Sequence, residues 1–345
     1  MKAIILSLLM IQSAFPCTIF SLYPNEEHWV GRTFDWAYGH GLVYTNKRNV
    51  TKTSVRILPT DVLSTWTSKY GSVTFNQFGR EFPTGGMNER GLIVEALELK
   101  SSIYQPVDTK ASFNELQFIQ YVLDNFQTIG EIRGALKGLR LAPVGSQLHY
   151  FTCDINECMT IEFINGKIET RHGNTLPISG LANNTYDESK DYAKEFVTFG
   201  GDKPVVQGSK ESLDRFVRSN YNVKSINEYD DKIQTLFAFL ADVGSVNNRW
   251  QIIYNQSQRT INFRTTAKIK LQRMIDVSAL DFSCQTPVKY FDLDSDSEGP
   301  IRHEFKDFDF NVNQSVIKKS VDMQKLPAAL TMRLAVYPNE TKCND

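Results

Sequence analysis

The chain has 345 residues, 41% of them hydrophobic, so it can bury a sizeable core. Its 38 Lys and Arg residues against 39 Asp and Glu give a net charge of −1, and the absence of a basic block or stripe argues against a nucleic-acid partner. The five histidines are scattered, with neither an H-E-x-x-H motif nor paired C-x-x-C motifs, so we expect no metal and no other cofactor.

Residues 1–16 have the features of a secretory leader. Lys2 precedes an apolar run that ends near Ile11, and this run is too short to span a bilayer. No later segment reaches transmembrane length. We therefore expect removal of residues 1–16, a single domain over residues 17–345, no membrane span, and a periplasmic or secreted location.

The cleavage position stays open between two sites. Signal peptidase requires a small residue before the cut, which favours Ala14 over Pro16. Cleavage after Ala14 would leave Phe15 and Pro16 to be removed by autoproteolysis. An alternative is a lipoprotein acylated at Cys17, although Phe15 and Pro16 do not fit the small residues expected there.

The mature chain begins with β-rich segments. Residues 18–23 and 28–36 predict a hairpin around residues 24–27, which would return Arg32 and Asp35 to Cys17. Further strands are expected at residues 42–46, 54–58, 72–75 and 90–99, with Gly85-Gly86 forming the turn before the last of them.

Helices and strands then alternate. Two S/T-x-x-E capping boxes, Ser112 with Glu115 and Thr128 with Glu131, predict helices over residues 112–126 and 132–139. The later elements are strands at 147–152, 159–164 and 167–171 with a tight turn at Asn165-Gly166, helices at 186–196, 211–217 and 226–243, a hairpin of 250–254 with 260–264, an irregular acidic stretch at 292–309 and a mixed segment at 319–337. This order is typical of a layered α+β protein.

Five cysteines leave one unpaired if the other four form disulfides. Cys153 and Cys158 flank a short loop between two expected strands, so an oxidising compartment predicts a disulfide between them; two free thiols are the alternative. A second bridge between Cys284 and Cys343 is compatible with the sequence, which does not decide it.

A chain that begins at Cys17 would carry a thiol and a free α-amine on one residue. Unperturbed pKa values are about 8.5 for the thiol and about 7.7–8.0 for the amine, so the amine can accept the thiol proton near neutral pH. Cys17 is thus a candidate nucleophile, with a buried structural cysteine as the alternative.

Five motifs occur in a fixed order. They are Cys17-Thr18, R-T-F-D at 32–35, G-M-N-E-R-G-L at 86–92, N-N-T-Y-D at 183–187 and Arg215-Phe216. Together they resemble the choloylglycine hydrolase family of N-terminal-nucleophile hydrolases, which includes penicillin V acylases, bile salt hydrolases and some acyl-homoserine-lactone acylases. The resemblance implies a four-layer α-β-β-α sandwich.

The resemblance also implies a role for each catalytic residue. Cys17 would attack an amide carbonyl and form a thioester. Arg32 would favour the thiolate and the neutral amine, and Asp35 would orient that amine. Asn183 would help to hold the oxyanion, and Arg215 would complete the charged network. Their structural alternatives are a salt-bridge arginine, a hairpin-end aspartate, a turn asparagine and an exposed helix arginine.

Two further residues are expected to contact the substrate. Trp36 follows Asp35 and would line the acyl pocket, with core packing as its alternative. Glu98 stands where many relatives have an asparagine or tyrosine that assists the oxyanion. Because a carboxylate is a poor donor, the backbone N–H of Glu98 is the expected contact.

These observations predict an exported cysteine amidase that acts on an N-acylated small molecule. Penicillin V or an acyl-homoserine lactone is the first substrate type and a conjugated bile salt the second. The alternatives are a secreted binding protein without activity and a lipoprotein anchored through Cys17. Relatives are often homotetramers, so a homotetramer is a possible assembly.

Overall fold

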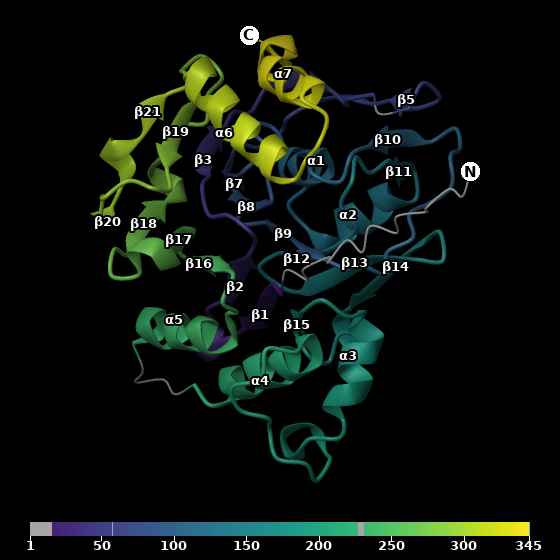
Figure 1. Cartoon of the computed structure of the whole chain (residues 1–345), viewed down its shortest axis with the longest axis vertical. Coiled ribbons are helices and arrows are strands. Elements are labelled where there is room, and N and C mark those ends of the chain that lie inside the picture. Colours follow the sequence, from purple (N-terminus) through teal and green to yellow (C-terminus); the bar gives the residue numbers. More distant parts are fainter. Residues whose placement is uncertain (1–15, 57, 227–230, 345) are drawn as a thin grey trace, which may run out of the picture.

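The computed structural model describes residues 16–56, 58–226 and 231–344 (Figure 1). The leader expected at residues 1–16 therefore lies outside the described residues, apart from Pro16. Within the described part of the chain, no helix is long and apolar enough to cross a membrane.

The first large sheet contains the nucleophile hairpin. In spatial order its described strands are β15 (Gly180–Leu181), β1 (Thr18–Leu22), β2 (Trp29–Asp35), β16 (Asn248–Asn255), β17 (Thr260–Thr265), β18 (Arg273–Asp276) and β20 (Gly299–Pro300). β1 and β2 are antiparallel, with Thr18 opposite Thr33 and Ile19 opposite Arg32. The predicted hairpin is confirmed, and it places Arg32 and Asp35 beside the start of β1.

The second large sheet faces the first. Its described strands are, in order, β14 (Lys167–His172), β13 (Cys158–Ile164), β12 (Leu148–Cys153), β9 (Ile93–Glu98), β8 (Gly85–Asn88), β7 (Ser72–Asn76), β3 (Leu42–Asn46), β19 (Lys289–Asp292) and β21 (Lys306–Asp307). Two small sheets accompany it: β11 (Leu139–Leu141), β10 (Ala111–Phe113) and β5 (Val62–Leu63); and β22 (Lys342–Cys343), β4 (Val50–Thr53) and β6 (Thr65–Thr67).

Helices cover the outer faces of the two sheets (Figure 1). The described helices are α1 (Gln117–Asn125), α2 (Ile129–Leu136), α3 (Tyr186–Ala193), α4 (Ser212–Lys224), α5 (Lys232–Val243), α6 (Phe310–Met323) and α7 (Ala329–Val336). α4 and α5 pack on β1, β2 and β16, whereas α1 packs on β8 and β9. The fold is thus the expected four-layer α-β-β-α sandwich of the α+β class.

Alternation along β1 separates two apolar cores. Ile19 belongs to the cluster between the sheets, and Phe20 belongs to the cluster beneath α5 with Leu236 and Phe237. Successive strand residues point to opposite faces, so both faces of this strand are buried. Gly31 opposes Phe20 in β2, and a Cβ there would lie 2.5 Å from the Phe20 ring. The close packing of this ring therefore requires glycine.

The expected turn at Gly85-Gly86 is wrong, because both residues belong to β8. The turn comes later, at residues 89–92, where Gly91 has φ +88°. A side chain at Gly85 would overlap the Glu95 carboxylate from β9. The double glycine thus makes room for a buried carboxylate instead of reversing the chain.

The expected helix start at Ser112 is also wrong. Ser112 lies in β10, which pairs with β5 and β11, and α1 begins at Gln117. The side-chain oxygen of Asn114 accepts hydrogen bonds from the backbone N–H groups of Leu116 and Gln117. Strand pairing therefore takes precedence over the local capping pattern.

The other predicted helices, strands and turns are compared with the structure in the same way. The Thr128–Glu131 capping box is confirmed at the start of α2, and Asn165-Gly166 forms the tight turn between β13 and β14. The strand expected at 54–58 is wrong: β4 ends at Thr53, and residue 57 lies outside the described residues. The helix expected from 226 begins at Lys232, with 227–230 undescribed, and the segment 319–337 contains the end of α6 and all of α7.

Two disulfides are present. Cys153 and Cys158 are joined directly across paired positions of β12 and β13, at an S–S distance of 2.04 Å. Cys284 and Cys343 form the second bridge, which fixes the C-terminal strand β22 beside β4. Cys17 is the only unpaired thiol among the described cysteines.

The long-range bridge predicts a stability effect. Replacing Cys284 and Cys343 together by serine should lower the free energy of unfolding by about 2–4 kcal/mol, because the bridge closes a long loop in the unfolded chain. Urea denaturation of the oxidised proteins would measure the change. Both cysteines are partly exposed, so the serine hydroxyl groups would stay in contact with water and would add little destabilisation of their own. An unchanged transition midpoint would contradict the prediction.

Candidate active site

Cys17 lies at the start of β1, between the two sheets, and its side chain is buried. Its thiol donates to the backbone oxygen of Asp35 at 3.7 Å, and the backbone N–H of Asp35 lies 3.5 Å from Sγ. The backbone N–H of Thr18 donates to Thr33 Oγ1 at 2.9 Å, which fixes the adjoining register. The hairpin thus holds the sulfur at the end of β2.

The groups around Cys17 have opposite effects on the pKa of its thiol. Burial raises the pKa of its thiol to about 11, while Arg32 lowers it and Asp35 raises it. The thiol is therefore protonated at neutral pH in this environment. Nucleophilic attack then requires a base that takes the thiol proton during the reaction.

Arg32 is buried and bridges the two large sheets. Its Nη1 lies 2.5 Å from Glu95 Oε2 in β9, and its Nη2 donates to the backbone oxygen of Ala96 at 2.7 Å. The Tyr254 hydroxyl, from β16, also donates to Glu95. Burial raises the pKa of Glu95 to about 7, with Arg32 and Tyr254 opposing that rise. The cation beside the thiol thus has its own buried counter-charge.

Asp35 is fixed by Ser245, just before β16, and by Asn248, the first residue of β16. Its Oδ1 accepts from the backbone N–H and the hydroxyl of Ser245, at 2.8 and 2.6 Å. Its Oδ2 accepts from Asn248 Nδ2 at 3.2 Å. These contacts hold the carboxylate rigidly beside Cys17, as an orienting group requires.

Arg215 connects α4 to the chain around the nucleophile. Its Nη1 donates to the backbone oxygens of Pro16 and Cys17, each at 2.6 Å, and to the Thr18 hydroxyl. Its Nη2 donates to Asn183 Oδ1 at 2.7 Å. Burial lowers its pKa to about 10, so it stays charged at neutral pH.

Asn183 and Glu98 are linked directly. The side-chain amide of Asn183 donates to the backbone oxygen of Glu98 at 2.8 Å. This bond, together with the bond from Arg215, fixes the Asn183 amide plane. The structure therefore brings Cys17, Arg32 and Asp35 together on the hairpin and joins Asn183 to Arg215 beside them.

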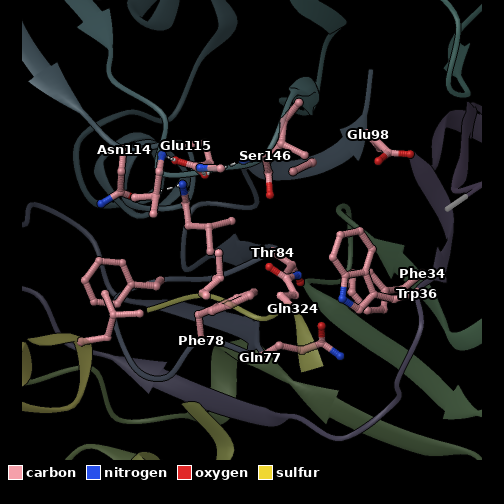
Figure 2. Close-up of a pocket in the computed structure, with 18 of the residues that line it drawn as sticks. Phe34, Trp36, Gln77, Phe78, Thr84, Glu98, Asn114, Glu115, Ser146 and Gln324 are labelled. Carbon is pink, nitrogen blue, oxygen red and sulfur yellow. Dashed lines mark hydrogen bonds between the residues drawn. The ribbon is translucent and has the colours of Figure 1, made fainter. Parts of the chain in front are cut away.

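A largely apolar pocket opens on Cys17 and Arg32. It encloses about 810 Å³ of space free of protein atoms, part of it continuous with solvent. Trp36 and Glu98 line it, as expected. Figure 2 shows Phe34 and Trp36 on one side, Asn114 and Glu115 on the other, and Phe78 and Thr84 between them.

Several polar side chains line the pocket, and some of them are hydrogen-bonded within the protein. The Glu115 carboxylate accepts from the backbone N–H groups of Val144, Gly145 and Ser146 at 2.8–3.1 Å. Gln77 donates to the backbone oxygens of Tyr38 and His40, but its own buried side-chain oxygen has no partner among the described residues. The pocket therefore offers a bound molecule mainly apolar contact.

One group of possible metal ligands lies away from this pocket. His28, Cys153 and Cys158 bring their ligand atoms within 4.8 Å of one another. Both sulfurs are engaged in the disulfide, so only the His28 nitrogen remains as a ligand. His149 is buried, and its two ring nitrogens lie within hydrogen-bond distance of Glu162 Oε1 and the backbone oxygen of Ala182.

Comparison with known proteins identifies the class. A family model for linear amide C–N hydrolases of the choloylglycine hydrolase family matches residues 17–176, beginning at the proposed nucleophile. Residues 17–176, just under half of the chain, thus match this family of linear amide C–N hydrolases.

The chain is also similar to penicillin V acylases over most of its length. A penicillin V acylase from Pectobacterium atrosepticum is 26% identical over 343 residues, covering 87% of each chain. The structure of penicillin V acylase from Agrobacterium tumefaciens has a TM-score of 0.75 and 26% identity, covering 85% of this chain and 98% of that one. A conjugated bile acid hydrolase variant from Clostridium perfringens has a TM-score of 0.67 at 18% identity, covering 82% and 98%, a likeness of fold alone.

The buried ion pair between Arg32 and Glu95 predicts that single and double variants differ in stability. Arg32→Met should destabilise the protein by about 3–5 kcal/mol, because it leaves the Glu95 carboxylate buried without its partner. Arg32→Met combined with Glu95→Gln should recover most of that stability. Both variants should still raise the pKa of the Cys17 thiol, since the neighbouring positive charge is absent.

The pH dependence of Cys17 alkylation by iodoacetamide would measure this shift, and urea denaturation the stability. Arg249→Met is a matched control, because the Arg249 guanidinium donates to the backbone oxygens of Trp36 and Ala37 rather than to a buried carboxylate. A double variant with the wild-type alkylation profile would mean that Arg32 has only a structural role.

Proposed function

We propose that the chain is an exported cysteine amidase whose mature form begins at Cys17 and which cleaves an N-acyl amide of a small molecule. The observation that carries this proposal is a deep apolar pocket that opens on a buried thiol next to Arg32, Asp35 and Arg215. An apolar acyl group can occupy the pocket while its carbonyl carbon meets Cys17 Sγ.

The mechanism follows from the groups around the sulfur. The freed α-amine of Cys17 takes the thiol proton as Sγ attacks the amide carbon. The C–N bond then breaks, the proton passes to the departing amine, and the acyl group remains as a thioester. Water hydrolyses the thioester, and the carboxylic acid leaves. Asn183 would help to stabilise the oxyanion.

Maturation uses the same sulfur. The Cys17 nitrogen is in a peptide bond with Pro16, whose carbonyl oxygen accepts from Arg215. This bond would polarise the carbonyl carbon for attack by the adjacent Sγ. The C–N bond breaks, the thiol proton passes to the Cys17 nitrogen, and water hydrolyses the thioester that links Pro16 to the sulfur. The α-amine is thereby released.

The first substrates to test are penicillin V and an acyl-homoserine lactone, followed by a conjugated bile salt. The penicillin V acylase relatives favour the first of these. Export and a homotetramer belong to the same proposal. The two disulfides support export, because disulfides form in an oxidising compartment.

Cys17→Ser should retain the fold and lose at least about 100-fold in kcat/KM, because a hydroxyl is a far weaker nucleophile than a thiol at this site. Hydrolysis of penicillin V, an acyl-homoserine lactone and glycocholate would measure the loss. A wild-type enzyme that is inactive on all three, yet binds them, would favour the binding-protein alternative.

Intact mass of the exported protein tests maturation. Wild type should begin at Cys17, whereas Cys17→Ala should keep at least Phe15 and Pro16. Arg215→Met should slow the removal of these residues, since the Pro16 carbonyl loses its charged donor. An active protein with any residue before Cys17 would overturn the mechanism, and an acylated Cys17 would support the lipoprotein alternative.

A further inference from the structure

The pocket connects two separate apolar clusters. Cys17 and Phe34 belong to the cluster between the large sheets, against which Trp36 packs. Phe82 and Leu334 belong to another cluster, which lies beneath the C-terminal helices α6 and α7. Residues of both clusters line the pocket. The cavity therefore extends from the nucleophile to α7.

One face of α7 forms the pocket wall. Leu330 and Leu334 are one helical turn apart and both line the pocket, as does Leu326 just before the helix. Met332, on the same helix, is 52% exposed and does not line the pocket. Residues four apart share a face of a helix, so α7 presents leucines to the pocket and Met332 to solvent.

This wall is fixed by contacts that need no ligand. The Tyr337 hydroxyl, immediately after α7, donates to the backbone oxygen of Thr53 and accepts from Gln117, each at 2.7 Å. The Ser320 hydroxyl in α6 donates to the backbone oxygen of Gln77, another pocket residue, at 2.6 Å. The Cys284–Cys343 disulfide holds the chain beyond α7. The protein's own contacts therefore hold the leucine face of α7 in the pocket wall.

We propose that Leu330 and Leu334 of α7 set the acyl-chain specificity of the active site, and that the substrate carries an unbranched apolar acyl chain long enough to reach them. This inference rests on the proposed amidase function and specifies its acyl group. It assigns the distal half of the pocket to the C-terminal helices.

Two physical arguments favour a long unbranched chain. A phenoxyacetyl group would fill the part beside Phe34 and Trp36 and leave the leucine wall in contact with solvent. Each additional methylene buried there should improve binding by about fourfold. A hydroxylated steroid that reached α7 would bring hydroxyl groups against Leu330 and Leu334, which cannot pair with them, and this costs free energy.

The test compares N-acyl-homoserine lactones from butanoyl to dodecanoyl as probes. In the wild type, kcat/KM should rise by about fourfold per methylene until the chain meets α7. Leu330→Trp, which fills the distal space, should lower kcat/KM at least about tenfold for the dodecanoyl probe and leave the butanoyl probe unchanged. Leu330→Ala should move the optimum to longer chains.

Met332→Trp is the matched control, because it adds the same bulk to the exposed face of α7. Its length profile should equal that of the wild type. A uniform loss over all lengths in Leu330→Trp, or a length profile unchanged in both Leu330 variants, would overturn the proposal.

Binding separates this inference from the proposed function. Free fatty acids, from butanoic to dodecanoic, can be titrated into the mature wild type and the Leu330 variants by isothermal titration calorimetry. Length-dependent binding that Leu330→Trp abolishes, without hydrolysis of any amide, would support the acyl site and reject the amidase. If the amides are hydrolysed but neither hydrolysis nor fatty-acid binding depends on chain length, the acyl site is rejected and the amidase function is kept.

Discussion

The ion pair between Arg32 and Glu95 is the interaction on which this site depends. Arg32 comes from β2 of the first sheet and Glu95 from β9 of the second, so the pair crosses the core between them. Both side chains are buried, and an unpaired charge there would cost several kcal/mol. The two sheets must therefore meet in one register, and that register places the guanidinium beside Cys17.

Several features of the sequence follow from this pair. Gly85 is required because the Glu95 carboxylate occupies the space of a side chain at that position. Tyr254 on β16 supplies a further hydrogen bond to the same carboxylate. Three strands that are distant in the sequence thus converge on one cation. The counter-charge also moderates the effect of Arg32 on the thiol, which stays protonated until a base acts on it.

The sequence predicted what is encoded locally and missed what is encoded between distant strands. The hairpin of β1 and β2 follows from a short turn between β-rich segments, so the placement of Arg32 and Asp35 beside Cys17 was accessible. Glu95 lies in an apolar strand, and nothing nearby identifies its partner. The double glycine was the available signal, but it is equally typical of a turn. Ser245 and Asn248, which orient Asp35, lie more than 200 positions away.

The same distinction separates chemistry from specificity in this fold. The polar and charged groups around Cys17 come from β2, the segment before α3 and helix α4, and they are fixed by buried hydrogen bonds that tolerate little change. The distal pocket wall comes from α7, near the other end of the chain, and contributes only apolar contact. Substitutions in α7 can therefore alter the volume of the pocket without moving any charge near the sulfur. A fold built in this way can change its acyl group while its mechanism stays constant, because the two functions depend on different elements and different forces.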